Sequence, residues 1–280
     1  MARAEISRYG GDLAACRRDA EAALTGFRTL GERFGMADAL DTLAFTAEVE
    51  GDYRRAVALV GEATGLADEL GLPEFEAGLH AGLGRLLSLQ GQHRRAQAVL
   101  GRALAEAERL GWRAGVAWVR GIAGLAARWR GELDEARAQL ERALVWSREM
   151  DASLIAAPTL ACLGFVLELQ GDLAAAGSVH REGLDHARRT GDPRTLALAL
   201  EGLAGVARAT GDAERAALLL RANGMRESAG APLPPAERVD VDRIEAAARR
   251  DLGEARLAEV LRRGAALSTD QAVALARSTS

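Results

Sequence analysis

The fold of this chain is decided by the stretch GELDEA at residues 131–136, whose pattern occurs six times in the sequence. Each copy lies 40 residues from the next and has a glycine, then an acidic or polar residue, and a small residue five places after the glycine. The other copies are GDLAAC at 11–16, GDYRRA at 51–56, GQHRRA at 91–96, GDLAAA at 171–176 and GDAERA at 211–216. A fixed period of this size predicts a solenoid of stacked supersecondary units.

The motif predicts a turn between two helices. Glycine ends a helix in the left-handed conformation, which other residues adopt only with strain. The polar residue after it caps the next helix, and the small residue lets two helices approach closely. A second loop recurs between the motifs, where Gly191, Asp192 and Pro193 predict a helix end, a cap and a first turn. We expect the first complete unit to hold helices over about 36–50 and 53–70.

Composition favours helices and excludes several classes of function. Hydrophobic residues make up 49% of the chain and aromatic residues only 4%, so alanine and leucine supply the apolar content. The net charge is −4 without a polybasic run, which gives no reason to expect direct binding to nucleic acid or to an acidic membrane. All 36 basic residues are arginine, which excludes lysine-based chemistry within these residues.

Nothing in the sequence predicts an enzyme or a cofactor. His80, His93 and His186 lie in different units without the spacing of metal ligands, and no nucleophile–base pattern is present. Cys16 and Cys162 lie more than three repeats apart, so we expect no bridge between them and a cytoplasmic location. The N-terminus has no apolar signal core, and no apolar run reaches the ~20 residues of a membrane-spanning helix.

His180 is an exception to the repeat, because it stands where the other units carry valine or leucine. Such a ring could contact a ligand or form a pH-sensitive joint. The competing interpretation is a core histidine at a locally irregular repeat.

The apolar spacing resembles the tetratricopeptide repeat (TPR) family. The first helices carry a pair of residues, the second of them small, at 43–44, 83–84, 123–124, 163–164 and 203–204, and the second helices carry an early alanine. This resemblance covers residues 9 to 223, although the family's usual period is about 34 residues. It implies an all-α, TPR-like right-handed α-α superhelix with repeats of about 40 residues.

The pattern changes at the C-terminal end and predicts two domains. Residues 1–224 are expected to form the solenoid, a partial first repeat followed by five helical hairpins, and residues 225–280 a helical C-terminal cap. We expect cap helices over about 236–250, 254–263 and 269–276, the last capped by Ser268 with Gln271 three residues on. Because only ten residues precede the first turn, we also expect the chain to be a fragment of a longer protein.

The C-terminal tail resembles the end of large bacterial transcriptional regulators. The matching stretches are GAPLPPAER at 230–238, GAALS at 264–268 and AVALA at 272–276. The regulators combine a DNA-binding domain, a STAND-type P-loop ATPase and a TPR-like sensor, in SARP-type and LuxR-type (maltose-regulator-like) classes; some cyclase-containing signalling proteins share this ending. No helix-turn-helix follows the tail as in the LuxR type, which favours the SARP-type or cyclase-type arrangement, or a trimmed chain.

The candidate site is the face of the first helices that would line a groove, called here the first-helix face. Its core positions are Asp41, Phe45, Arg85, Trp118, Leu125, Arg128, Trp129, Phe165 and Glu168, and Asp38, Glu48, Leu89, Glu201 and Arg208 also lie on it. Aromatic side chains with arginine are the usual anchors for a protein partner. Two interpretations stay open, because the aromatic rings could instead pack between adjacent first helices and the charges could simply be solvated.

The sequence thus predicts a non-catalytic TPR interaction or sensor module. The resemblance implies the C-terminal regulatory region of a bacterial transcriptional regulator. Its partner would be a protein or peptide, its own upstream ATPase and DNA-binding domains, or a small-molecule effector. The alternative is a free-standing TPR adaptor that binds peptides.

Overall fold

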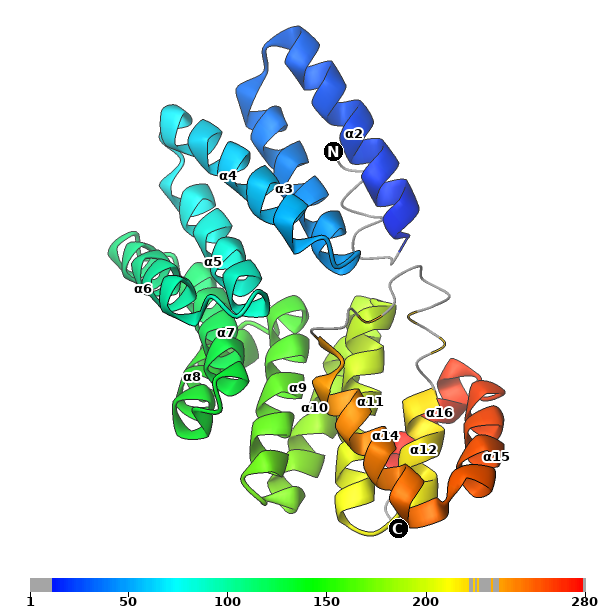
Figure 1. The fold of residues 1–280 in the computed structure, drawn as a ribbon. Coiled ribbons are helices and arrows are strands. Elements are labelled where there is room, and N and C mark those ends of the chain that lie inside the picture. The colour runs from blue at the N-terminus through cyan, green and yellow to red at the C-terminus, as the bar shows by residue number, and fades with distance from the viewer. Residues whose placement is uncertain (1–11, 222–223, 225, 227–232, 234–236, 279–280) are drawn as a thin grey trace. The chain divides into compact units, whose positions relative to one another are not determined.

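The structure of the protein is a computed structural model, which describes residues 12–221, 224, 226, 233 and 237–278. These residues form helices and no strand, so the predicted all-α repeat fold is confirmed (Figure 1). The first helices of the hairpins are α3 (Arg33–Val49), α5 (Pro73–Leu89), α7 (Arg113–Trp129), α9 (Ser153–Leu169) and α11 (Pro193–Ala209). The second helices are α2 (Leu13–Leu30), α4 (Tyr53–Leu70), α6 (His93–Arg109), α8 (Leu133–Glu149), α10 (Leu173–Thr190) and α12 (Ala213–Arg221). The tail forms α14 (Val239–Leu252), α15 (Glu254–Ala265) and α16 (Thr269–Arg277).

The helices belong to two compact units. The first holds α2–α8, up to Met150, and the second holds α9–α16, from Asp151 onward. The predicted partial helix before Gly11 and most of the predicted junction at 222–236 lie outside the described residues.

The repeated glycine motif makes the turn that the sequence predicts. Gly51, Gly91, Gly131, Gly171 and Gly211 all have positive φ. The capping part of the motif holds only where the next residue is aspartate: Asp52 accepts a hydrogen bond from Arg55 N at 3.0 Å, and Asp172 one from Ala175 N at 3.1 Å. Gln92 and Glu132 make no such bond, because their side chains accept hydrogen bonds from Arg95 and Arg130 instead.

Helix α3 begins three residues earlier than predicted. Glu32 caps α3 by accepting hydrogen bonds from Phe34 N at 3.1 Å and Gly35 N at 2.7 Å, so the helix starts at Arg33 instead of Met36. At the equivalent loop of α11, Asp192 caps the helix and Pro193 occupies its first turn, as the sequence predicts.

Each hairpin closes where a small residue of the first helix meets a large residue of the second. A Cβ added to Gly84 would lie closer than 3.0 Å to Leu100, and one added to Gly124 equally close to Leu140. The early alanine is fully buried in α4, α6, α8, α10 and α12, as is Cys16 at the same position of α2. Backbones that approach this closely leave no space for a further methyl group.

In the fourth hairpin His180 takes the place of leucine and fits between two helices. Its ring is fully buried and meets the ring of Phe165 edge-on, with centroids 5.1 Å apart and planes at 76°. A Cβ at Gly164 of α9 or at Gly202 of α11 would overlap this ring. The histidine is therefore a packed core residue that links α10 to both neighbouring first helices.

The tail helices cover the last repeat. Ala217 of α12 packs with Ala248 of α14 and with Leu257 and Val260 of α15 in one buried apolar cluster. A capping box begins α16, in which Ser268 Oγ accepts from Gln271 N at 3.2 Å and Gln271 Oε1 accepts from Ser268 N at 2.8 Å. A solenoid needs such a cap because its last repeat has no successor to bury its apolar face.

We expect Gly202→Ala to lower the free energy of unfolding by about 1–3 kcal/mol, because the new methyl group overpacks the site of the buried His180 ring. Gly101→Ala is the matched control: it lies within α6 with no atom within 4 Å of the added Cβ, and should raise stability by about 0.5–1 kcal/mol. Chemical denaturation of both variants checks this. Equal stability changes in the two variants would contradict the packing of His180.

Candidate functional site

The first unit carries seven of the predicted site residues on three first helices. Asp41 and Phe45 lie on α3, Arg85 lies on α5, and Trp118, Leu125, Arg128 and Trp129 lie on α7. Asp41 and Phe45 are four residues apart, and Leu125 lies seven residues after Trp118, three before Arg128 and four before Trp129. These spacings place Asp41 with Phe45, and Leu125 with its neighbours on α7, on one side of their helices.

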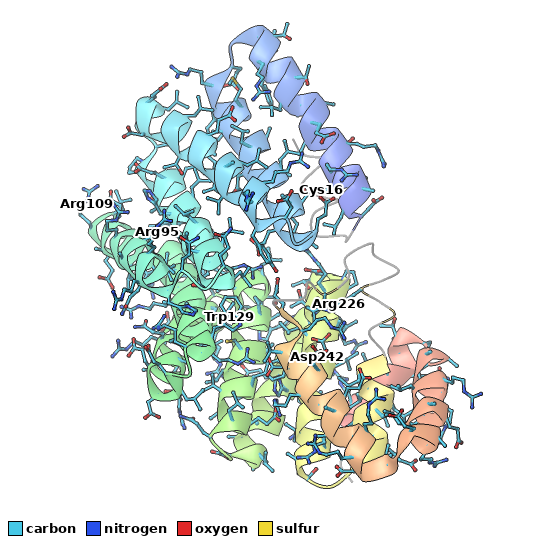
Figure 2. The ribbon with its side chains drawn as sticks, viewed as in Figure 1. Cys16, Arg95, Arg109, Trp129, Arg226 and Asp242 are labelled. Atoms are coloured by element: carbon cyan, nitrogen blue, oxygen red, sulfur yellow. The ribbon has the colours of Figure 1, made fainter. Side chains whose placement is uncertain are left out.

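Trp118 is the most exposed aromatic side chain of this set, with 37% of the residue accessible. Its ring also packs on α5, since a Cβ added to Gly78 would lie 3.2 Å from it. Phe45 and Trp129 are half-buried; Trp129 is labelled in Figure 2. Trp118 thus combines features of both interpretations, because the ring rests on the neighbouring first helix and still offers a surface.

One ion pair in the first unit joins two neighbouring first helices. Arg85 of α5 forms an ion pair with Glu48 of α3, which is buried. Glu48 is therefore not simply a solvated charge. Asp41 and Arg128 are half-buried.

In the second unit three residues of the first-helix face are buried. Phe165 and Glu201 each retain 2% accessibility and Glu168 retains 9%. The residues that bind the two carboxylates come from the chain itself, C-terminal to the repeats.

Glu168 is bound by Arg243 of α14. Two parallel hydrogen bonds join them, from Arg243 Nη1 to Glu168 Oε1 at 2.8 Å and from Nη2 to Oε2 at 3.1 Å. Burial opposes the charge of Arg243, but the hydrogen bonds and charge of Glu168 outweigh it and raise the pKa of the guanidinium. The guanidinium of Arg243 therefore stays charged at any physiological pH.

Two further ion pairs connect α11 to the C-terminal residues. Arg226, labelled in Figure 2, donates from Nε to Glu201 Oε1 at 3.1 Å and from Nη2 to Oε2 at 3.2 Å. Arg208 Nε lies 3.5 Å from Asp251 Oδ2 of α14. The sequence predicts Glu168, Glu201 and Arg208 on the first-helix face but not their partners Arg243, Arg226 and Asp251.

One signal in the sequence could have revealed this contact. The position held by Phe45, Arg85, Leu125 and Phe165 in earlier repeats is Gly205 in the last. A Cβ at Gly205 would lie 2.5 Å from Glu168 Oε2, so the glycine provides the space that this carboxylate fills. The loss of a large side chain at a repeat position indicates that another group occupies its place.

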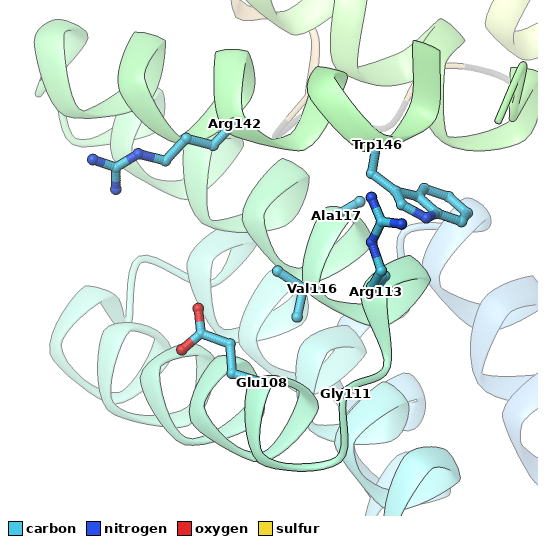
Figure 3. Close-up of a pocket in the computed structure, with 7 residues that line it drawn as sticks. All are labelled: Glu108, Gly111, Arg113, Val116, Ala117, Arg142 and Trp146. Atoms are coloured by element: carbon cyan, nitrogen blue, oxygen red, sulfur yellow. The ribbon is translucent and has the colours of Figure 1, made fainter. Parts of the chain in front are cut away.

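A shallow pocket of about 270 Å³ lies elsewhere in the first unit, at the loop between α6 and α7 (Figure 3). Its lining residues are Glu108, Gly111, Arg113, Val116, Ala117, Arg142 and Trp146. None of the predicted site residues lines it. A small effector held in this pocket would therefore not contact the predicted aromatic positions.

In the described part of the chain, no group of three histidine, cysteine, aspartate or glutamate side chains is placed to hold a metal ion. None of the described helices has the length and apolarity needed to cross a membrane.

No protein-family model and no curated protein matches this chain. Solved structures do. The structure of a Rap protein complexed with competence and sporulation factor aligns with a TM-score of 0.74 and 15% identity, over 95% of this chain and 72% of that one. BtubC (BKLC) from P. vanneervenii aligns with a TM-score of 0.58 and 22% identity, over 78% of this chain and 92% of that one. At such identities the likeness shows the fold, a TPR-like helical repeat.

We expect Arg226→Met to destabilise the second unit by roughly 3 kcal/mol, because it leaves the carboxylate of Glu201 buried without its cation. Adding Glu201→Leu should recover most of that loss, since replacing both charges with apolar groups removes the unpaired one. Urea denaturation of the single and double variants measures the coupling. Additive losses would show that the two side chains do not act as a pair.

His186 gives the second unit an acid-sensitive contact between α9 and α10. Its Nδ1 lies 2.7 Å from Arg189 Nη2 and 3.0 Å from Ser153 Oγ. Burial lowers the pKa of His186 below its usual 6.5, and the charge of Arg189 lowers it further, against smaller opposite effects of Glu182, Asp151 and Asp185. Accepting a hydrogen bond from Arg189 requires an unprotonated ring nitrogen.

This contact predicts a loss of stability in acid. The unfolded chain takes up a proton at His186 near pH 6.5 and the folded chain only at lower pH, so the free energy of unfolding should fall as pH drops below about 6.5. Above that pH His186 should not make the free energy of unfolding depend on pH. Thermal unfolding of the wild type and His186→Gln between pH 5 and 8 isolates the effect. Parallel curves for the two proteins would rule it out.

Proposed function

We propose that the first unit binds a peptide or helix of a partner protein on its first-helix face, and that the chain is non-catalytic. The observation that carries this is a contrast between the two units. Phe45, Arg85 and Leu125 of the first unit are half-buried at the position where Phe165 of the second unit is buried, and Trp118 presents an exposed aromatic surface in the first unit. An aromatic ring beside arginine is the composition of binding hot spots.

The fold supports the same proposal. The Rap protein of similar fold was solved complexed with competence and sporulation factor, which makes the binding of a factor by such a repeat array a reasonable model for this chain. The shallow pocket beside Trp146 gives a small-molecule effector a less favourable site, because it is open and lies apart from the aromatic positions.

We further propose that the chain is the sensor region of a bacterial transcriptional regulator of the SARP or LuxR (maltose-regulator-like) type, in which the partner would include its own ATPase and DNA-binding domains. The resemblance of the tail supports this context. The coding sequence upstream of Met1 tests it: a continuous frame encoding a P-loop ATPase would support the regulator, and a stop codon with a ribosome-binding site would favour a free-standing adaptor.

Peptides selected from a random library on the immobilised chain test the binding face. Two variants are compared with the wild type: Trp118→Ala, and the double variant Arg128→Glu/Trp129→Ala. We expect each to lower the affinity for the selected peptides about 30-fold, the effect of losing a hot spot of ~2 kcal/mol. Trp146→Ala is the matched control, since this tryptophan lies on the second helix α8. Isothermal titration calorimetry gives the affinities. Selected peptides that bind all four proteins equally would show that the first-helix face is not the site.

A further inference from the structure

The first-helix face of the second unit already holds a helix, and that helix belongs to the same chain. Arg243, near the start of α14, binds Glu168 of α9, and Asp251, near its end, lies beside Arg208 of α11. Figure 1 shows α14 running along this side of the unit. The contact has the form of a helix bound in a groove, with one charged anchor near each end.

The contact of α14 with α9 and α11 differs from the packing between the two helices of a hairpin. Within hairpins, leucine or histidine side chains fill spaces left by glycine. The apolar side chains that α14 buries are Val241, Ile244, Ala247 and Ala248, of which Ala248 packs on α12 and α15. The ion pairs of Arg243 and Asp251 join the helix to α9 and α11. A contact of this kind is specified by charge pattern, so another helix with the same pattern can replace it.

The surface is shaped for an arginine that the repeats do not supply. Gly205 leaves room for the Glu168 carboxylate, which is buried and would be costly to leave without a cation. In the first unit the equivalent carboxylate, Glu48, is neutralised from within the repeats by Arg85. At the position of Arg85 the last repeat has Gly205, so the cation comes from α14 instead.

We propose that the face of α9 and α11 is a helix-binding surface that α14 occupies in cis, and that an amphipathic partner helix with the same pattern competes with α14 for it. This pattern is taken from α14, where Arg243 and Asp251 are eight residues apart. Apolar residues, mostly alanine, lie between them on the side of the helix that is buried. This inference does not depend on the proposed function, because it concerns the second unit and would hold if the first unit bound nothing.

A fluorescent peptide of residues 237–253 is the probe, added to the full chain and followed by anisotropy. Arg243→Glu or Asp251→Arg in the chain should repel its own α14 from Glu168 or Arg208, while the unaltered peptide keeps the matching charges. We expect both variants to bind the peptide at least tenfold more tightly than the wild type. Arg250→Glu, the same charge reversal at an exposed position of α14, is the matched control and should bind like the wild type.

Two further arms make the result decisive. A peptide carrying Arg243→Glu should bind the two variants no more tightly than it binds the wild type, since its glutamate would face Glu168. Trp118→Ala, added to the Arg243→Glu or Asp251→Arg variant, should leave peptide binding unchanged. Loss of binding would place the peptide on the first unit, which would overturn this inference and support the proposed function.

Folded variants that bind the peptide no better than the wild type would show that α14 is a permanent cap and would overturn the proposal. Circular dichroism verifies folding. Should Arg243→Glu prevent folding by leaving Glu168 without its cation, Asp251→Arg decides alone, because the Asp251–Arg208 pair lies at the partly exposed rim.

Discussion

The structure depends on the close approach of two helix backbones within each hairpin. That approach requires a residue without a side chain, or with a very small one, opposite a large one, as Gly84 is opposite Leu100 and Gly124 opposite Leu140. Everything else in the repeat is arranged so that these two positions meet, including the left-handed glycines that set the turn between the helices. A chain rich in alanine and poor in aromatic residues suits this architecture, because helices that lie so close together leave space only for small side chains between them.

The sequence predicted the hairpins well because their determinants are local. A glycine, an aspartate and a buried alanine lie within six residues of one another, so the turn, the cap and the helix contact are visible in one short motif. The error in the start of α3 came from Glu32, whose capping role depends on side-chain geometry that a pattern does not contain. The same limit explains why the motif predicted caps at Gln92 and Glu132 that do not form.

The contacts of the candidate site could not be predicted in this way. Glu168 and Arg243 are separated by 75 residues, and Glu201 and Arg226 by 25. Nothing in a helical period says which of many arginines will reach a given carboxylate. Gly205 is the informative residue, but a glycine in a helix usually indicates close helix packing and does not by itself point to a buried carboxylate.

The two units use equivalent positions in different ways. In the first, Glu48 and Arg85 satisfy each other, and the aromatic surface around Trp118 is left accessible. In the second, the repeats supply the carboxylates Glu168 and Glu201, and residues that follow the repeats supply the arginines. The bidentate geometry of these pairs suits arginine, whose planar guanidinium matches a carboxylate in a way that lysine does not.

The glycine–leucine pairs also bear on how such a chain can evolve. Because the two matched positions belong to the first and second helix of one hairpin, gene duplication or recombination preserves the fit only if its breakpoints fall in the loops that precede first helices. A breakpoint at the GELDEA turn would combine a glycine from one lineage with an unmatched partner from another. The fourth hairpin is more constrained, since His180 also requires Gly202 of the next one. Recombination between the fourth and fifth hairpins would therefore separate His180 from the glycine that makes room for it.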